Sequence, residues 1–246
     1  MLSRNKKILI AVISALLSGC GLFLTGILPA LQKATTHQNQ VLTNESTSFI
    51  STSTLTSLVD FEALLSTNPD TVGWLSVPDT TIDYPVVQSD NNETYLRTDF
   101  EGNENISGCV FLDASYNSSR SPKPQNSVLY GHSVKNGEGL FNDLHYYLDE
   151  NFYNAHRIIR YDRPNDPAEW EIFAVLEVAP TYDYRRPDFK NSEDFLNYFN
   201  KIQAESLYKT EDTIKIQSTD EILTLSTCSF NMDNGRLIIL AHRIYP

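Results

Sequence analysis

The sequence predicts a mainly β domain with helical insertions, in which the strands form a closed or sandwiched sheet. Short runs of β-branched and aromatic residues recur along most of the chain. Pro, Gly, Asn and Asp separate these runs, as they commonly do between strands. Only a few stretches show the periodicity of a helix. So many short strands are typical of a barrel or a sandwich, and not of a sheet built from alternating strands and helices.

Length and charge narrow the possible functions. A chain of 246 residues can bury one substantial core. Its formal net charge of -12 argues against a nucleic-acid binder, because neutralising phosphates requires clustered Lys and Arg. The three cysteines Cys20, Cys109 and Cys228 match neither a disulfide framework nor a Cys/His metal spacing. We therefore expect no metal and no cofactor, and each cysteine needs its own explanation.

The first 31 residues are expected to be a cytoplasmic tip followed by a transmembrane signal-anchor. Basic residues precede a nearly unbroken apolar run, residues 8–31, that is long enough to cross a bilayer as a helix. This charge pattern favours an N-terminus in the cytoplasm and a body outside. Leu17 to Cys20 also fit a lipoprotein cleavage box, which would make Cys20 a lipidated first residue. Because the apolar run continues beyond Cys20, we favour the uncleaved anchor; both alternatives leave an extracytoplasmic domain on the membrane.

A tether and an entrance helix follow the anchor. Residues 32–53 are rich in Thr, Ser, Asn and Gln and have little to bury, so they are expected to be a flexible tether. The folded domain is expected to span residues 54–246. Apolar residues recur at roughly helical spacing from Leu55 to Leu65 and stop at Asn68 and Pro69, which predicts an amphipathic helix.

The remaining runs predict the strands and two helical insertions. The strands are expected at residues 72–77, 84–88, 109–112, 127–130, 157–161, 170–178, 214–217, 221–227 and 237–244. The first insertion is expected from Leu140 to about Tyr153. The second, from Ser192 to Tyr208, has a Ser N-cap and an apolar face.

Cys228 is the candidate nucleophile. A strand rich in Ile, Leu and Thr ends at this thiol, directly before a turn, and a strand end is a rigid place for a reactive group. From position alone, a small buried hydrophobic residue is the alternative. A hairpin across the turn would bring Arg236 beside Cys228, where a permanent cation could favour the thiolate and hold an oxyanion. The alternative for Arg236 is a solvated residue at a hairpin edge.

A cysteine nucleophile also needs a proton partner, and histidine is the natural one at neutral pH. His132 follows an apolar run and is expected at a strand end, so we favour it. His145 falls within a predicted helix and His156 at the start of a strand, where structural or exposed roles are more common. His242 shares a strand face with Arg236, but six residues at about 3.3 Å each separate them.

These residues also resemble a known family. Leu225 to Cys228, the downstream Arg236, and Tyr130-Gly131-His132 are similar to the sortase signature of a TLxTC strand, an arginine and a histidine. Further stretches resemble class B sortases: residues 70–78, 82–88, 99–102, 111–113, 148–153 and the helix predicted at 192–208. The resemblance covers the chain from about Leu55 to its C-terminus.

The resemblance implies a fold, a reaction and a location. It implies an eight-stranded sortase β-barrel with an N-terminal helix and a helix inserted before the strand that carries the cysteine. It also implies a single-pass membrane enzyme of a Gram-positive bacterium, with its catalytic domain outside the membrane. This transpeptidase would cleave a Thr-Gly-type bond in the sorting signal of secreted proteins to give a thioacyl enzyme, and would then pass the acyl group to a peptidoglycan precursor amine. Cys228 would be the nucleophile, His132 the general acid and base, and Arg236 the substrate and oxyanion clamp.

The resemblance also implies a substrate groove. The residues at matching positions are Asn92, Leu96, Ser226 and Thr227, with Tyr182 and Tyr184 in the segment that should wall the groove. Simple packing is the alternative for Leu96, Tyr182 and Tyr184. Cys109 stands where the family pattern needs no thiol, so we expect it to be buried and inert.

Two other functions suit the same sequence. A cysteine endopeptidase would use the same groups, with water in place of the amine. A tethered, non-catalytic binding protein would suit the anchor and the acidic body, and would not need Cys228. The sequence leaves open the sorting motif, the acceptor amine, the client proteins and the oligomeric state.

Overall fold

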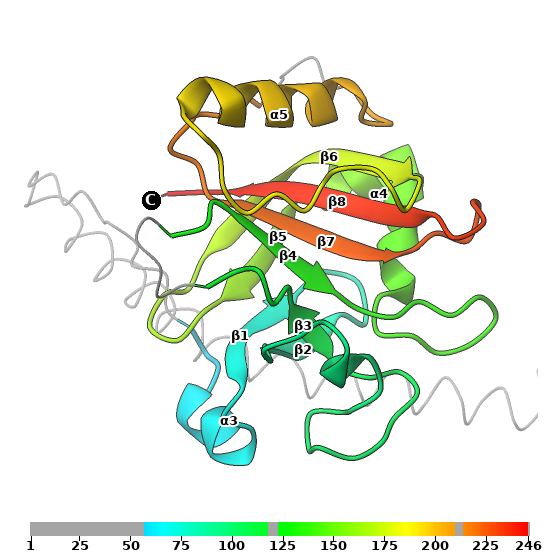
Figure 1. The fold of residues 1–246 in the computed structure, drawn as a ribbon. Helices are drawn as coiled ribbons and strands as arrows, with labels where there is room; N and C mark the ends of the chain where they lie inside the picture. The colour runs from blue at the N-terminus through cyan, green and yellow to red at the C-terminus, as the bar shows by residue number, and fades with distance from the viewer. Residues whose placement is uncertain (1–56, 118–122, 210–213, 246) are drawn as a thin grey trace, which may run out of the picture. The chain divides into compact units, whose positions relative to one another are not determined.

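The computed structural model describes residues 57–117, 123–209 and 214–245, and the strands among them close into a barrel (Figure 1). The predicted anchor and tether, residues 1–31 and 32–53, lie outside the described residues. Within the described ranges, no helix has the length and apolar character needed to span a membrane. The strands are β1 (Thr71–Ser76), β2 (Asp83–Val87), β3 (Val110–Leu112), β4 (Asn126–Tyr130), β5 (Ile158–Asp162), β6 (Glu169–Val178), β7 (Ile222–Cys228) and β8 (Arg236–Arg243).

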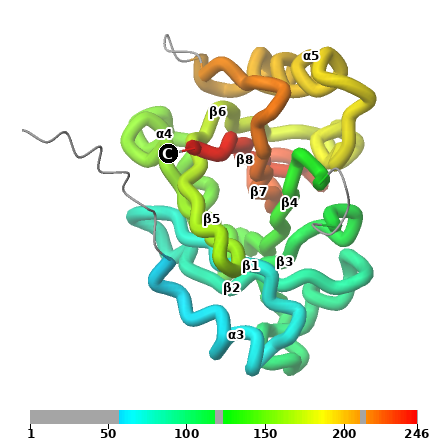
Figure 2. The backbone as a smooth tube through the Cα atoms, turned by 90° about the vertical axis from the view of Figure 1, so that its left-hand side faces the viewer, coloured from blue at the N-terminus to red at the C-terminus, as the bar shows by residue number. Residues whose placement is uncertain are grey.

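The barrel has the strand order β1-β2-β3-β4-β7-β8-β6-β5, and β5 pairs with β1 to close it (Figure 2). Two pairs are parallel, β2 with β3 and β4 with β7, and the others are antiparallel. The predicted eight-stranded barrel is therefore confirmed. Strands β4 and β7 are almost 100 residues apart in sequence, and their parallel pairing makes both run toward the same end of the barrel.

Alternate side chains along β7 and β8 belong to two different hydrophobic clusters. Leu223 and Leu225 belong to the main hydrophobic cluster, which contains side chains from every strand of the barrel. Ile222 on β7 and Ile238 and Leu240 on β8 belong to a second cluster. Because successive side chains of a strand point to opposite faces, this second face of β7 and β8 also carries Ser226, Cys228 and Arg236.

The helix α5 (Ser192–Ala204) covers this second face (Figure 1). Asn191 and not the predicted Ser192 caps it, because the side chain of Asn191 accepts a hydrogen bond from the backbone N–H of Asp194. Its buried side chains Phe195, Phe199 and Ile202 pack in the cluster that contains Ile238 and Leu240. The other helices are α3 (Phe61–Thr67), α4 (Glu150–Ala155) and the 3₁₀ helices η1 (Thr94–Leu96) and η2 (Asn142–Leu148).

Residues 214–217, predicted as a strand, form none in the structure. Ile216 is buried in the cluster beneath α5, and the carbonyl of Ile214 accepts a hydrogen bond from Gln203 of that helix. The apolar alternation therefore reflects packing against α5 and not pairing in a sheet.

The predicted helices differ from the observed ones at their boundaries. The predicted entrance helix begins only at Phe61, because Asp60 caps it, and Leu58 is 96% exposed. The insertion at 140–153 is two helices, since Asp149 is extended and its side chain accepts hydrogen bonds from the first backbone N–H groups of α4.

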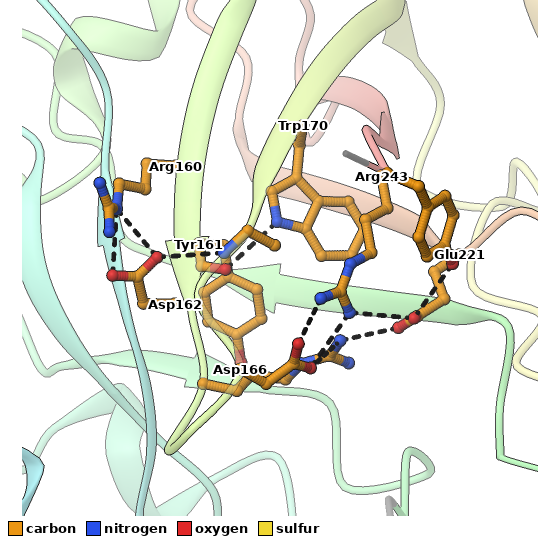
Figure 3. A network of polar contacts seen from close by, with 10 residues as sticks. Arg160, Tyr161, Asp162, Asp166, Trp170, Glu221 and Arg243 are labelled. Atoms are coloured by element: carbon orange, nitrogen blue, oxygen red, sulfur yellow. Dashed lines mark hydrogen bonds and ion pairs between the residues drawn. The ribbon is translucent and has the colours of Figure 1, made fainter. Parts of the chain in front are cut away.

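A network of ion pairs joins the ends of β5, β6, β7 and β8 (Figure 3). Arg243 at the end of β8 bonds to Asp166 in the turn between β5 and β6 and, at 3.1 Å, to Glu221 before β7. Arg163 bonds to the same two carboxylates at 2.6 and 2.9 Å. Glu221 is at the opposite end of β7 from Cys228, so the network stabilises the barrel about 20 Å from that thiol.

Replacing Arg243 by Met should lower the free energy of unfolding by about 1 to 3 kcal/mol. The substitution keeps most of the aliphatic stem and leaves two partly buried carboxylates with one cation. Urea denaturation at neutral pH measures this, and Arg243→Lys should recover part of the loss as the matched control. A change below about 0.5 kcal/mol would show that the network contributes no more than a surface ion pair.

Candidate active site

A cavity of about 290 Å³ opens at the ends of β4 and β7, and we call it the cysteine pocket. Its lining residues are Asn92, Leu96, Phe111, Tyr130, Gly131, His132, Tyr184, Arg185, Ser226, Thr227, Cys228 and Arg236. All the residues that the sequence analysis selected line this one cavity, with the exception of Tyr182. The hydroxyl of Tyr182 instead donates to Glu205, directly after α5, at 2.5 Å.

Cys228 is the last residue of β7 and is exposed, whereas the six residues of β7 before it are buried. Its Cα partner on β8 is Arg236, so the two side chains lie next to each other on one face of the sheet. The hairpin predicted from the sequence therefore forms in the expected register. A rigid, buried strand delivers the thiol to the cavity.

The guanidinium of Arg236 is held by the turn that precedes it. Its Nη1 donates to the carbonyl oxygens of Asn234 at 2.9 Å and Gly235 at 3.0 Å. The turn itself is closed by a hydrogen bond from the N–H of Ser229 to the carbonyl of Gly235. Arg236 therefore brings a fixed positive charge to the cavity, with its other N–H groups making no hydrogen bond to the described residues.

His132 lies beside the end of β7 because β4 and β7 pair in parallel. Tyr130 is the Cα partner of Ser226, so the chain that continues to His132 follows the chain that continues to Cys228. The hydroxyl of Thr227 donates to the carbonyl of Gly131 at 2.7 Å. The hydroxyl of Ser133 donates to the carbonyl of Cys228 at 2.8 Å. Hydrogen bonds on both sides thus fix the main chain of His132 against that of Cys228.

The ring of His132 is turned toward η1. Its Nε2 lies 2.9 Å from the carbonyl oxygen of Leu96, and because a carbonyl only accepts, Nε2 carries the proton. Among the described residues, no hydrogen bond joins the ring of His132 to the sulfur of Cys228. The histidine and the thiol therefore reach the same cavity as separate groups, and the carbonyl of Leu96 orients the imidazole.

Gly131 is required by a close approach inside the barrel. A Cβ at this position would lie 2.6 Å from the ring of Phe141, which is fully buried. The N–H of Phe141 also donates to the carbonyl of His132 at 2.8 Å. Packing around Phe141 thus fixes the backbone that presents the histidine.

The loop after Cys228 has several anchors. Ser229 donates to the carboxylate of Glu177 at 2.5 Å, and the side-chain amide of Asn231 donates to the same carboxylate. The ring of Phe230 stacks on His145, with centroids 3.7 Å apart and planes 4° apart. Burial lowers the pKa of His145, although its hydrogen bond to Asn142 acts in the opposite direction. A neutral imidazole therefore supports the loop that follows the thiol.

The walls of the cavity are joined by polar contacts. The hydroxyl of Tyr184 and that of Ser226 are 2.9 Å apart, and the hydroxyl of Tyr130 donates to Asp113 at 2.6 Å. Burial raises the pKa of the Asp113 carboxyl, but the hydrogen bonds from Tyr130 and Ser115 outweigh it and the net shift is downward. Asp113 is therefore an anion that holds Tyr130 in place.

Sequence reasoning missed Phe111, Tyr130, Gly131 and Arg185 as lining residues. A signal existed for Tyr130, because it stands two residues before His132 on the same strand run. No such signal existed for Arg185, which reaches the cavity from the segment between β6 and α5.

The other cysteine of the domain takes no part in the cavity. Cys109 is buried beside Val87 and Phe111, and burial raises the pKa of its thiol to about 12. It is therefore unreactive. In the described part of the chain, no group of three or more His, Cys, Asp or Glu side chains is arranged to hold a metal ion.

Comparison with known proteins gives consistent matches. A family model described as the sortase domain matches residues 75–244. Sortase B of Listeria monocytogenes is 37% identical over 174 residues, which are 70% of this chain and 69% of that protein. Sortase B of Staphylococcus aureus is 30% identical over 183 residues, which are 74% of this chain and 73% of that protein.

Solved structures agree with these matches. The structure of sortase B from Clostridium perfringens has a TM-score of 0.70 and 32% identity, and covers 76% of this chain and 100% of that one. A sortase B–substrate complex from Staphylococcus aureus has a TM-score of 0.68 and 30% identity, and covers 75% of this chain and 84% of that one.

Gly131→Ala should lower the free energy of unfolding by about 1 to 3 kcal/mol, because the added methyl group overlaps the ring of Phe141. Phe141→Leu in the same chain makes room for it. In a double-mutant cycle by urea denaturation, we expect the double variant to be more stable than the sum of the single losses predicts. Additive losses would show that the close contact does not limit position 131.

The stability of the folded domain should fall as pH drops below about 6.5, partly because of His145. Burial lowers its folded pKa, so the unfolded chain takes up a proton that the folded chain does not. His145→Phe keeps a ring against Phe230 and removes the titrating group. Urea denaturation at pH 7.5 and 5.0 should show a smaller drop in the free energy of unfolding for this variant than for the wild-type protein. An equal drop would contradict the assignment to His145.

Proposed function

This chain belongs to the sortase family and is a sortase B-type cysteine transpeptidase that anchors surface proteins. We propose that Cys228, His132 and Arg236 carry its reaction. The reaction is cleavage of a C-terminal sorting signal through a thioacyl intermediate, followed by transfer to a peptidoglycan amine. The observation that supports it is the convergence of the three side chains on the cysteine pocket.

In the first step, the thiolate of Cys228 attacks the carbonyl carbon of the scissile peptide bond. Arg236, its direct partner across the sheet, offers N–H donors to the oxyanion that forms. Protonated His132 gives its proton to the leaving amine nitrogen, and the C–N bond breaks. The products are a thioester on Cys228, a free amine and neutral His132.

In the second step, the amine of the peptidoglycan precursor attacks the thioester. Neutral His132 accepts the proton that the attacking nitrogen loses, and the C–S bond breaks to return the thiolate. The new amide joins the surface protein to the wall precursor. The atoms balance with no cofactor.

The walls of the cysteine pocket suit a peptide substrate. Leu96 and Tyr184 offer apolar surface in the cavity that contains the thiol, and Asn92, Ser226 and Thr227 add polar groups. Asn92 accepts a hydrogen bond from the N–H of Ala114 at 2.7 Å, which orients its side chain. A similar chain from Staphylococcus aureus is known in complex with a substrate, which supports this assignment.

The location that suits this reaction is the outer face of a Gram-positive cell membrane. Residues 1–31 would serve as a single-pass anchor and residues 32–53 as a tether, which together keep the catalytic domain near membrane-bound wall precursors.

Cys228→Ala should lower turnover of a fluorogenic peptide with a Thr-Gly bond by at least about 10³-fold, because no thioester can form. Arg236→Lys should lower it by about 10²-fold, since a point charge replaces the fixed donors. Mass spectrometry of stalled wild-type enzyme should show the acyl group on Cys228. Cys109→Ala is the matched control, and it should keep both turnover and the adduct because Cys109 is buried outside the pocket.

An added amine separates the possible acceptors. We expect an amide product with diaminopimelate or oligoglycine in the mixture. Peptide cleavage without an amide product for any added amine would show that the protein is a cysteine endopeptidase. The absence of both turnover and adduct, with a folded protein, would leave a non-catalytic binding protein.

A further inference from the structure

The charge of the cysteine pocket differs from that of the whole protein. The chain has a formal net charge of -12. The lining of the pocket nevertheless contains two arginines and a histidine and no carboxylate. Arg236 lies beside the nucleophile, which leaves Arg185 as a fixed cation without a role in the chemistry.

Arg185 differs from the arginine next to it. Arg186 donates to Asp194 at 2.6 Å, and its guanidinium lies against the rings of Phe189 and Tyr198, at 4.8 and 5.0 Å from their centroids. Those contacts attach Arg186 to α5. Arg185 is exposed and forms no ion pair within 4 Å among the described residues, and Asp113 acts on it only from farther away. Arg186 therefore stabilises the fold, whereas Arg185 lines the cavity.

The backbone of Arg185 is nevertheless fixed on both sides. The side-chain amide of Asn126 donates to the carbonyl of Tyr184 at 3.0 Å and to that of Arg186 at 3.2 Å. The guanidinium lies 5.9 Å from the centroid of the Tyr184 ring and beside the hydroxyl of Tyr130. A pre-positioned arginine of this kind loses little freedom when it binds an anion.

The register of β7 relates the position of the Arg185 guanidinium to that of the Cys228 thiol. Tyr130 is the Cα partner of Ser226, and the hydroxyl of Tyr184 contacts the hydroxyl of Ser226. Ser226 stands two residues before Cys228 on the same face, which is about 7 Å along the strand. An extended peptide has nearly the same rise per residue. In a peptide that lies along β7, a side chain two or three residues from the attacked carbonyl would come level with Tyr130 and Tyr184, which lie beside the guanidinium.

Resting on the proposed function, we propose that Arg185 is a specificity-determining residue that binds the carboxylate of an Asp or Glu in the sorting signal, two or three residues from the scissile bond. The planar guanidinium can bind a carboxylate through two parallel hydrogen bonds. The hydroxyl of Tyr130, which donates to Asp113, lies beside the guanidinium and helps to hold it. Peptides with Lys at the same position meet a like charge and are rejected.

The test compares quenched fluorescent peptides that contain a Thr-Gly bond and carry Glu, Gln or Lys at the second or the third position from that bond, on either side of it. In wild-type enzyme at low salt, we expect kcat/KM at one position to be about five- to tenfold higher for Glu than for its isostere Gln. Arg185→Ala should bring that ratio to about one, and Arg185→Glu should favour Lys. Added salt should reduce the ratio, because the site is exposed.

Lys201→Glu, on α5, makes the same change in net charge outside the pocket and should leave the Glu/Gln ratio unchanged. Unchanged thermal unfolding of the Arg185 variants would confirm that they fold. A wild-type enzyme that turns peptides over, with a Glu/Gln ratio near one at every position or a ratio that Arg185→Ala does not alter, overturns this inference alone. A wild-type enzyme that cleaves none of the peptides overturns the proposed function as well.

Discussion

The parallel pairing of β4 with β7 is the constraint on which the site depends. It sets the residues after Tyr130 beside the residues after Ser226, although almost 100 residues of sequence separate the strands. The antiparallel pairing of β7 with β8 then brings Arg236 next to Cys228 from the other side. Neither pairing alone assembles three functional groups. Because β7 is shared by both, a one-residue slip in its register would turn Cys228 to the opposite face and separate it from Arg236.

Stability and chemistry are divided between the two ends of the same strands. At one end of β7 and β8, Glu221 and Arg243 take part in a network of ion pairs, and the middle of both strands is covered by α5. The other end is free of such packing on the side of Cys228, which is exposed. The buried part of β7 fixes the position of the Cys228 thiol, while the thiol itself stays accessible.

The sequence was most informative where local signals determine the structure. The strand that ends at Cys228, the turn after it and the return of Arg236 follow from residue pattern and turn chemistry. The break at Asp149 has a capping signal of the same kind, although the prediction passed over it. Positions that depend on tertiary packing were beyond reach. Residues 214–217 alternate like a strand but pack under α5, and Arg185 reaches the pocket from a segment that Asn126 holds through hydrogen bonds to Tyr184 and Arg186.

The main chain of the site is rigid, whereas its side chains are joined to the walls and not to one another. Hydrogen bonds from Thr227 and Ser133 lock the backbones of His132 and Cys228 together. The imidazole, however, bonds to the carbonyl of Leu96, which lines the same cavity. Under the proposed mechanism, a peptide bound in the cavity would meet His132 and Cys228 as two separate groups. We expect bound substrate to connect the two groups, which would tie proton transfer to occupancy of the pocket.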